Sequence, residues 1–516
     1  MLEVLTKFNN NIYNKYQLNI TSFKTLPGLA LAVYNSSYLP EKFKSEIKMI
    51  KGELEREIRS SYFGGNVDVF YNQISEGYYY DLNSQYPKAM LNDMPVGDPV
   101  LSLETNLDKI FGFVFGEIYC PDEKTLRVPF IQYKDPITRN VSCPRGKFKR
   151  LIFSEEAKYA LKYGYQINIE YCYQFKRGVD LFKDYVNDLY EIKSLTKDPV
   201  LYSLSKLFLN SLYGRMGMKE LSNTMKIVDK KEAEALDKTC NVSIFSELAD
   251  NKYLVKFSGK LSESILNLLS ESLESKNLNK TYEYSKEQLR KSGLNKTISV
   301  PSAVHVAAAI TSYARIIINE YKNIPGNPCI MSDTDSAVLP FPLPSHLVGK
   351  ELGQMKLENV IELGIFIRKK LYYIKNSNNQ EIIRASGIDS SRLNYESFVK
   401  LLKGETIEIP RQTFNVDWKD LNITVEKSNI ILQGLQGKIK TIYNTPDANF
   451  RFISLPKNYN IIIHPLFPIL RTSPNKILIK KNIISEFSYL EIFTYFIFIL
   501  VILSLFALFL YKVYII

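Results

Sequence analysis

Histidine and paired cysteine are scarce in this sequence. The three histidines (His305, His346 and His464) lie far apart, and no two of the five cysteines form a CxxC pair. An odd, widely spaced set of cysteines argues against a disulfide framework and against a zinc ribbon or finger. Scattered histidines do not suggest an imidazole metal site. Any metal is therefore expected to be a hard cation with oxygen ligands, and Mg²⁺ fits best.

Arginine and a secretory signal are both missing at the N-terminus. The first arginine is Arg56, which argues against an Arg-rich transit peptide. The composition favours Asn, Ile, Lys, Tyr and Phe and includes only one tryptophan, Trp418. Such a bias is typical of an AT-rich genome, such as that of an organelle or a plasmid. A mitochondrial protein of this kind is expected to be encoded in the organelle rather than imported.

Acidic residues are outnumbered, since 54 Asp and Glu stand against 66 Lys and Arg, which gives a net charge of +12. With 516 residues, 45% of them hydrophobic, the chain can bury one large core of several lobes or form two to three domains. A charged fraction of 23% argues against disorder. The positive charge suits a partner with a phosphate backbone, although an excess of lysine also serves solubility alone.

The longest run without a charged residue lies near the C-terminus. Residues 492–511 carry no charge over twenty positions, between Glu491 and Lys512. That length predicts a transmembrane helix and a membrane association for the protein. A buried core helix fits poorly, because the segment is apolar on every side and comes at the end of the sequence. A tail acquired by fusion of reading frames, with no role in activity, is the other alternative.

The hydrophobic patterns predict a mixed α+β fold. Strands are expected at 67–71 and 77–80, and residues 94–153 are rich in β patterns. Pro87 fits the first turn of a helix that runs through Met90. Further helices are expected at 154–162, 178–196, 199–213 (ended by Gly214) and 304–321. Residues 219–299 form a polar insertion, and beyond residue 374 only 407–410 and 430–435 suggest strands.

Three aspartates are candidate ligands for catalytic metal. Asp81 ends an aromatic strand, and Asp333 and Asp335 flank Thr334 at the tip of a predicted hairpin. Turn chemistry alone can explain Asp-Thr-Asp-Ser, because these residues favour turns. Asp81 arriving from a neighbouring strand would instead complete a carboxylate group for two divalent ions.

One face of the helix expected at 199–213 carries polar side chains. Lys206, Asn210 and Tyr213 fall at i, i+4 and i+7, while Leu204, Leu207, Phe208 and Leu212 are assigned to the apolar side. Lys193 lies one helix upstream, where a helical hairpin could bring the two ammonium groups together. A triphosphate between them would relieve their repulsion. A solvated lysine face is the alternative, but it does not explain Asn210 and Tyr213 on the same stripe.

Five motifs in order resemble those of the family B DNA polymerases, in the protein-primed branch of phages and linear mitochondrial plasmids. DLNSQYP (81–87) and SDTDS (332–336) resemble the two palm motifs, and KLFLNSLYG (206–214) resembles the fingers motif. YFGG (62–65) resembles the template-binding YxGG element, and KLY (370–372) resembles the KxY element that grips the primer end. The resemblance covers about residues 1–390.

The resemblance implies a right-hand fold of palm, fingers and thumb with two insertions. It divides the chain into 1–75 (the part that follows an exonuclease domain, with the YxGG linker), 76–93 (palm), 94–180 (first insertion, contacting a priming protein), 181–218 (fingers), 219–300 (second insertion), 301–390 (palm) and 391–486 (thumb-like), before the hydrophobic helix at 492–511. DNA template and primer, dNTPs and a terminal protein would be the partners.

The resemblance also assigns roles to single residues. Asp81 and Asp335 would ligate two Mg²⁺ ions, with Asp333 assisting. Nucleotide binding would fall to Tyr86, which would exclude a 2′-hydroxyl, and to Lys193, Lys206, Asn210 and Tyr213. DNA binding would fall to Tyr62, Gly64, Gly65, Lys370 and Tyr372.

The chain departs from the family pattern at two places besides the hydrophobic C-terminal segment. Met331 replaces the usual tyrosine of the second palm motif. The first aspartate of the chain is Asp68, so residues 1–60 cannot supply an acidic proofreading site, and we expect no 3′–5′ exonuclease activity in this chain.

The predicted function is DNA-directed DNA synthesis on a primer 3′-hydroxyl or a terminal protein hydroxyl, in replication of a linear mitochondrial plasmid or its integrated copy. A catalytically decayed DNA-binding remnant is the alternative. An RNA-templated polymerase fits less well, because such enzymes usually place adjacent aspartates in the hairpin.

Overall fold

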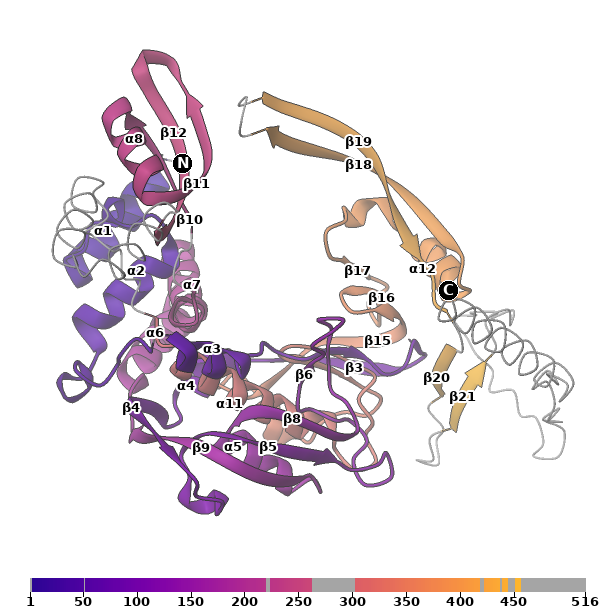
Figure 1. Cartoon of the computed structure of the whole chain (residues 1–516). Coiled ribbons are helices and arrows are strands. Elements are labelled where there is room, and N and C mark those ends of the chain that lie inside the picture. The colour runs from indigo at the N-terminus through magenta and orange to yellow at the C-terminus, as the bar shows by residue number, and fades with distance from the viewer. Residues whose placement is uncertain are drawn as a thin grey trace, which may run out of the picture. The chain divides into compact units, whose positions relative to one another are not determined.

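A large mixed sheet, with antiparallel and parallel strand pairs, carries the candidate aspartates. Several of its strands can be followed in Figure 1. The computed structural model describes residues 2–50, 52–219, 223–261, 302–417, 422–436, 439–443 and 451–455, all within one compact unit, Met1–Asn460. In the described residues this central sheet has ten strands in the order β1-β13-β14-β3-β15-β2-β20-β21, with β16 beside β15 and β17 beside β16. They are β1 (Val67–Val69), β2 (Gln73–Ile74), β3 (Gly77–Leu82), β13 (Met331–Asp333), β14 (Ser336–Leu339), β15 (Met355–Arg368), β16 (Leu371–Asn376), β17 (Glu381–Ala385), β20 (Ile439–Tyr443) and β21 (Arg451–Leu455).

Strand β3 places its side chains on two different faces. Tyr80 and Leu82 are 2% and 1% exposed and pack into a core with Ile318 and Tyr321 of helix α11 (Val304–Lys322). Because successive side chains of a strand point to opposite faces, Asp81 lies on the face away from α11. Helix α4 (Gln85–Met90) follows directly, with Pro87 in its first turn and its end at Met90, as predicted.

The β-rich pattern of residues 94–153 is confirmed as part of a second, four-stranded antiparallel sheet. Its order is β4-β9-β5-β8, with β4 (Met94–Ser102), β5 (Gly112–Cys120), β8 (Gly146–Phe153) and β9 (Gln166–Gly178). Helix α5 (Ser154–Leu161) packs on it through Ala157 and Ala160. A short hairpin of β6 (Tyr133–Lys134) and β7 (Val141–Ser142) lies between β5 and β8 in the sequence.

Helices from two distant parts of the sequence share one hydrophobic core. Helices α1 (Leu2–Tyr16), α2 (Leu26–Val33) and α3 (Gly52–Ser60) join α6 (Lys183–Leu195) and α7 (Pro199–Met216) there. Helix α6 begins five residues later than predicted, because strand β9 continues to Gly178. The prediction that Gly214 ends the next helix is wrong: α7 continues to Met216 and Gly217 is its C-cap. Asp198 caps the start of α7 by accepting from the Val200 amide.

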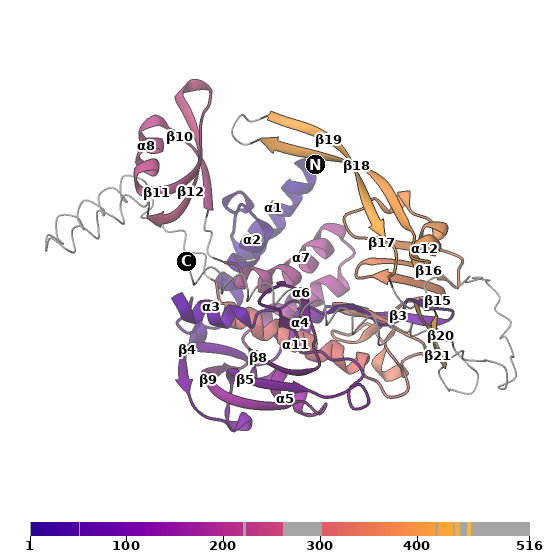
Figure 2. The ribbon, with the colours of Figure 1, turned by 45° about the vertical axis from the view of Figure 1, so that its right-hand side comes forward.

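Two further groups of elements follow α7 and the central sheet (Figure 2). Strands β10 (Asn223–Asp229), β12 (Lys252–Leu261) and β11 (Cys240–Glu247) form a sheet beside helix α8 (Lys230–Thr239). Regular structure therefore occurs in a polar stretch whose sequence showed little periodicity. Strands β18 (Thr406–Asp417) and β19 (Asn422–Gln433) form a long hairpin after helix α12 (Tyr395–Leu402). Strand β18 extends beyond the strand expected at 407–410 at both ends, whereas β19 begins before the strand expected at 430–435 and ends at Gln433.

The predicted transmembrane helix at 492–511 lies outside the described residues. Among the residues that are described, no helix combines the length and apolarity that a membrane crossing requires. Two other predicted segments also lie outside the described residues: the rest of the second insertion, 262–300, and the end of the thumb-like segment, 456–486.

Candidate active site

Strand pairing brings the candidate aspartates together. Ser336 of β14 pairs with Asp81 of β3, and Asp333 pairs with Ser336 across the β13–β14 hairpin. The Leu82 amide donates to the main-chain oxygen of Asp335 at 2.8 Å, which fixes Asp335 beside the end of β3. Asp81 and Asp333, 252 residues apart along the chain, therefore lie on strands that flank β14 in one sheet.

Burial makes these carboxyl groups unusually weak acids. Burial raises the pKa of Asp81 to about 7, with Asp335 contributing in the same direction and Lys356 and Lys206 opposing it. Burial is also the main cause that raises the pKa of Asp335, and Asp333 adds to it. Like charges this close favour the protonated forms unless a cation lies between them. Within the described chain, neither Asp81 nor Asp335 has an ion-pair partner.

The donor set suits a magnesium ion that is shared with a substrate. Mg²⁺ usually binds through one or two carboxylates together with waters and substrate phosphates, and Asp81 and Asp335 supply two such oxygen donors. Over the residues that the structure describes, there is no group of three or more His, Cys, Asp or Glu side chains able to enclose a metal alone. The fit is thus to an open site completed by a ligand. Asp333 differs from the other two, because Lys370 Nζ donates to its two oxygens at 2.7 and 2.9 Å.

The lysines predicted to bind phosphate lie near the aspartates and near each other. Lys193 of α6 donates to Ser84 Oγ at 2.9 Å. Burial lowers the pKa of the Lys193 ammonium, and the charges of Lys206 and Lys356 lower it further. Lys356 was not predicted. It lies on β15 directly opposite Asp81 and pairs with Glu358 at 2.8 Å, and its charge acts on the pKa of both Asp81 and Lys193.

Tyr86 and Tyr213 form a stacked aromatic wall. Their ring centroids are 4.1 Å apart at an interplanar angle of 14°. Burial raises the pKa of Tyr86, and both side chains are only partly exposed. Asn210 lies on the same helix as Tyr213, one turn earlier, and is exposed. The residues expected to surround a nucleotide are therefore contributed by α4, α6 and α7.

The residues predicted to bind DNA fall into two groups. Lys370, besides its ion pair to Asp333, is about half exposed, whereas Tyr372 is 4% exposed and its hydroxyl lies 3.4 Å from that of Tyr79. The YFGG loop forms the other group, with Tyr62 packed closely against Gly217. Gly65 is in close contact with the hairpin tip, since a Cβ atom there would lie 2.5 Å from Thr334 Cγ2.

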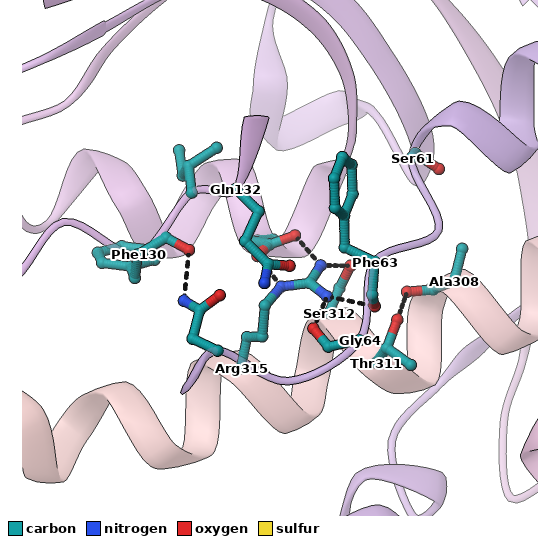
Figure 3. Close-up of polar contacts among 12 residues, drawn as sticks. Ser61, Phe63, Gly64, Phe130, Gln132, Ala308, Thr311, Ser312 and Arg315 are labelled. Atoms are coloured by element: carbon teal, nitrogen blue, oxygen red, sulfur yellow. Dashed lines mark hydrogen bonds and ion pairs between the residues drawn. The ribbon is translucent and has the colours of Figure 1, made fainter. Parts of the chain in front are cut away.

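Residues outside the motifs hold this hairpin tip in place. Thr334 has a φ of +62° and its amide donates to Asn66 O at 3.0 Å. Gln85 Nε2 donates to Thr334 O at 3.2 Å and to Ala314 O at 2.8 Å. On helix α11, Arg315 is 1% exposed and reaches the main chain of the YFGG loop (Figure 3). An arginine placed between Ala314 and the apolar run Ile316–Ile318 was the sequence signal that could have revealed Arg315.

Met331, the departure from the family motif, is 2% exposed. It packs in the core of the central sheet with Ile330 and Val338. A methionine fits this apolar position, and both neighbouring aspartates keep their places in the hairpin.

Two hollows adjoin the site. One, of about 640 Å³, is lined by Asp81 and Tyr79 together with Glu358, Glu381 and Arg384. The other, of about 1140 Å³, borders the YFGG loop, and we name it the basic groove. Seven cationic side chains line it against the single carboxylate of Glu55: Arg56, Arg59, Lys134, Arg139, Lys149, Arg150 and Lys219.

The family model and the relatives that this chain resembles are all described as DNA polymerases. The family model described as DNA polymerase type B, organellar and viral, matches residues 1–321. A probable DNA polymerase of Agaricus bitorquis is 38% identical over 445 residues, covering 84% of this chain and 55% of that protein. A probable DNA polymerase of Podospora anserina is 31% identical over 415 residues, covering 78% of this chain and 33% of that protein. The chain thus spans about half or less of the length of these curated relatives.

A solved structure shows the same fold. Phi29 DNA polymerase in complex with primer-template DNA and incoming nucleotide superposes with a TM-score of 0.57 at 18% identity, covering 81% of this chain and 69% of that one. The curated DNA polymerase of Bacillus phage phi29 is 30% identical over 189 residues, which is 34% of this chain and 33% of that protein. The α+β fold of the described residues is therefore one that a DNA polymerase adopts.

Proposed function

Because this chain belongs to the organellar and viral type B DNA polymerases, we propose that it catalyses DNA-directed DNA synthesis. The observation that carries the proposal is the meeting of Asp81, near the end of β3, with Asp335, in the turn just before β14. Lys356 lies opposite Asp81, close enough for its charge to act on both Asp81 and Lys193. Phosphoryl transfer requires mainly positioned reactants and positive charge around the phosphates. Carboxylates for metal and ammonium groups for phosphate, side by side, meet that requirement.

Asp81 and Asp335 are proposed to hold two Mg²⁺ ions, which when bound activate the attacking 3′-hydroxyl and stabilise the leaving pyrophosphate. Lys193 and Lys206 bind the triphosphate as point charges, and Lys356 adds a third. Burial is the main cause that lowers the pKa of Lys193, and an anion between the ammonium groups would relieve the further lowering that the charges of Lys206 and Lys356 cause. Asp333 acts through its ion pair with Lys370, which places that lysine at the primer end.

Tyr86 and Tyr213 are proposed to line the nucleotide pocket. Their stacked pair is a rigid apolar surface, and the deoxyribose would lie against Tyr86, so that a 2′-hydroxyl would meet the ring. Asn210, exposed on α7, would contact the nascent base pair. Tyr372 is nearly buried and would act on the primer mainly through its hydrogen bond with Tyr79.

The template strand is proposed to pass the YFGG loop and follow the basic groove. The groove is lined by seven cations and one carboxylate, and a polyanion is the partner that such a surface favours. Tyr62, Gly64 and Gly65 border it and also approach the hairpin tip. This arrangement connects a strand in the groove with the candidate active site.

The remaining assignments are proposals that rest on family membership. Residues 76–93 and 301–390 would be palm, 181–218 fingers, and 391–486 thumb-like, with 94–180 and 219–300 as insertions. Priming by a terminal protein hydroxyl, replication of a linear mitochondrial plasmid, and the absence of proofreading from this chain belong here too. Fungal relatives among the probable DNA polymerases support the mitochondrial proposal.

Primer extension by the full chain with Mg²⁺ and dNTPs tests the proposed function. Asp335→Ala and Asp81→Ala are each expected to lower the rate on the order of 10²–10³-fold, the cost of losing one electrostatic stabiliser of a transition state. Asp108→Ala is the matched control, because Asp108 is exposed and lies outside the site, and it should extend like the natural chain.

Equal incorporation by the natural chain and Asp335→Ala would end the polymerase assignment for this site. No incorporation by a folded natural chain that still binds primer-template DNA would instead favour a non-catalytic DNA-binding remnant.

A further inference from the structure

A buried ion pair joins the four-stranded sheet unit to the long helix beneath the central sheet. Glu156 of α5 and Arg315 of α11 are each 1% exposed as side chains, with Arg315 Nη2 at 2.6 Å and Nε at 2.7 Å from the Glu156 oxygens. Two parallel bonds of this kind fix the guanidinium plane as well as its position. The two residues lie 159 positions apart, in segments proposed above as first insertion and palm.

The remaining face of the same guanidinium holds the YFGG loop. Arg315 Nη1 donates to Phe63 O at 2.8 Å and to Gly64 O at 3.3 Å, and Nη2 donates to Ser312 Oγ at 2.9 Å (Figure 3). Five contacts therefore converge on one side chain. Because Glu156 orients the guanidinium, it determines where Arg315 presents its donors to the loop.

The loop in turn contacts the catalytic hairpin. Gly65 packs on Thr334, and Asn66 O accepts the Thr334 amide at 3.0 Å. Thr334 lies between Asp333 and Asp335, so a shift of the loop moves the residue that separates the two aspartates. From Glu156 to the hairpin, each step of this path is a close contact within the described residues.

We propose that Glu156 and Arg315 are positioning residues that set the YFGG loop and, through it, the hairpin that carries Asp333 and Asp335. Neither side chain reaches the candidate active site itself. Their role is to hold the YFGG loop and the carboxylates of the hairpin in a fixed position relative to each other. This inference rests on the proposed function, because it concerns the rate of that reaction.

Simple stabilisation of the fold is the competing explanation. A buried ion pair is weak evidence for net stability, since the cost of desolvating both charges offsets their attraction. Arg315 also holds two main-chain oxygens of the YFGG loop, so a displaced guanidinium would shift that loop as well as weaken the core. A test must therefore separate a change in active-site geometry from a smaller folded fraction.

Single-turnover nucleotide incorporation makes that separation. The rate constant reports the geometry of the reacting complex, whereas the amplitude reports the fraction of competent protein. Arg315→Lys keeps the charge but cannot span Glu156 and both carbonyl oxygens, and we expect its rate constant to fall about tenfold to a hundredfold, as for a displacement of catalytic groups. Glu156→Gln should lower the rate constant in the same direction, with the apparent KM for dNTP changed by no more than about twofold.

A matched control lies one position away on the same helix. Glu155 pairs with Lys158 at 2.7 Å and both are partly exposed, without a contact to the loop. Glu155→Gln should keep the natural rate constant. Gly65→Ala provides a second approach if Arg315 variants fail to fold, because its Cβ would press on Thr334 while the ion pair stays intact. It too should lower the rate constant at full amplitude.

The outcomes are distinct. Reduced amplitude with natural rate constants in Arg315→Lys, Glu156→Gln and Gly65→Ala would overturn the positioning role and leave the polymerase proposal standing. A natural chain that incorporates nothing would overturn the proposed function, and this inference with it. Rate constants lowered in all three variants, but not in Glu155→Gln, would support it.

Discussion

At the scale of single residues, the pKa of Asp81 shows how strongly the folded environment changes the acidity of a carboxyl group. Aspartate ordinarily loses its proton near pH 4. Burial and Asp335 raise the pKa of Asp81 to about 7 in the metal-free chain. The group that should bind Mg²⁺ is thus partly protonated at neutral pH until a cation arrives, because the ion must displace that proton.

The sign of the resulting pH effect can be worked out. The folded chain keeps the Asp81 proton up to about pH 7, whereas the unfolded chain releases it near pH 4. The stabilisation from this proton is present at low pH and is lost as the pH rises from the unfolded to the folded pKa. Asp81→Asn removes the titration. In thermal unfolding with a chelator, it should raise the Tm relative to the natural chain more at pH 8 than at pH 4.

A Tm difference that is the same at both pH values would contradict the raised pKa of Asp81. Asp108→Asn serves as the control, because it removes one carboxylate at an exposed position outside the site.

At the scale of elements, helix α7 has a polar face and a buried apolar face, and its sequence predicted only part of the boundary between them. Lys206 and Asn210 are exposed and Tyr213 stacks on Tyr86, whereas Leu204, Phe208 and Leu212 are buried. Leu207, assigned to the apolar side, is 46% exposed, so that assignment was wrong. The helix turns 100° per residue, and a position beside a buried residue can already lie at the boundary of the apolar face.

The two neighbours Phe208 and Leu207 provide a stability prediction. Phe208 is 1% exposed, so Phe208→Ala should lower the free energy of unfolding by about 3–5 kcal/mol through lost burial and a new cavity. Leu207→Ala should change it by less than about 1 kcal/mol, since its side chain is already about half in water. Denaturant unfolding of the two variants checks both values. Equal losses would mean that Leu207 is buried.

At the scale of the whole molecule, the net charge of +12 is not spread evenly. The basic groove gathers cations from α3, from the β6–β7 hairpin, from β8 and from Lys219, three positions beyond the end of α7. Ion pairs reduce part of this charge: Arg59 pairs with Glu55, and Lys149 pairs with Glu170 at 2.6 Å. Lys134 and Arg139 are exposed and form no ion pair within the described chain.

Charge reversal in the groove should therefore weaken binding of single-stranded DNA. The double variant Lys134→Glu and Arg139→Glu is expected to raise Kd by about tenfold or more at low salt and to reduce the slope of log affinity against log salt by about 1.4, or 0.7 per phosphate contact. Fluorescence anisotropy over a salt series measures both quantities.

The matched control for this experiment is the double variant Lys109→Glu and Lys124→Glu, which changes the net charge equally at exposed positions outside the groove. If both double variants weakened binding to the same extent, only the overall charge would matter, and the groove would not be the template path.

The sequence by itself determined the chemistry and the local structure. The order of the motifs indicated the family, and the residue patterns identified Asp81, Asp335, Lys193, Lys206 and Tyr213 as candidate site residues. Residue type and helical or strand periodicity can be read from a short stretch of sequence, because they are local properties. The strand ending at Asp81, the first turn at Pro87 and the hairpin at Asp333 also depended on neighbouring residues alone.

Only the tertiary structure decided which distant residues share a site. Lys356 joins it through the pairing of β15 with β3, and Arg315 and Glu156 become relevant only because two remote helices bury them against the YFGG loop. The raised pKa of Asp81 has the same origin. Burial and electrostatic coupling depend on distances in space, and contacts across 100 or more residues leave no periodic signal in a single sequence.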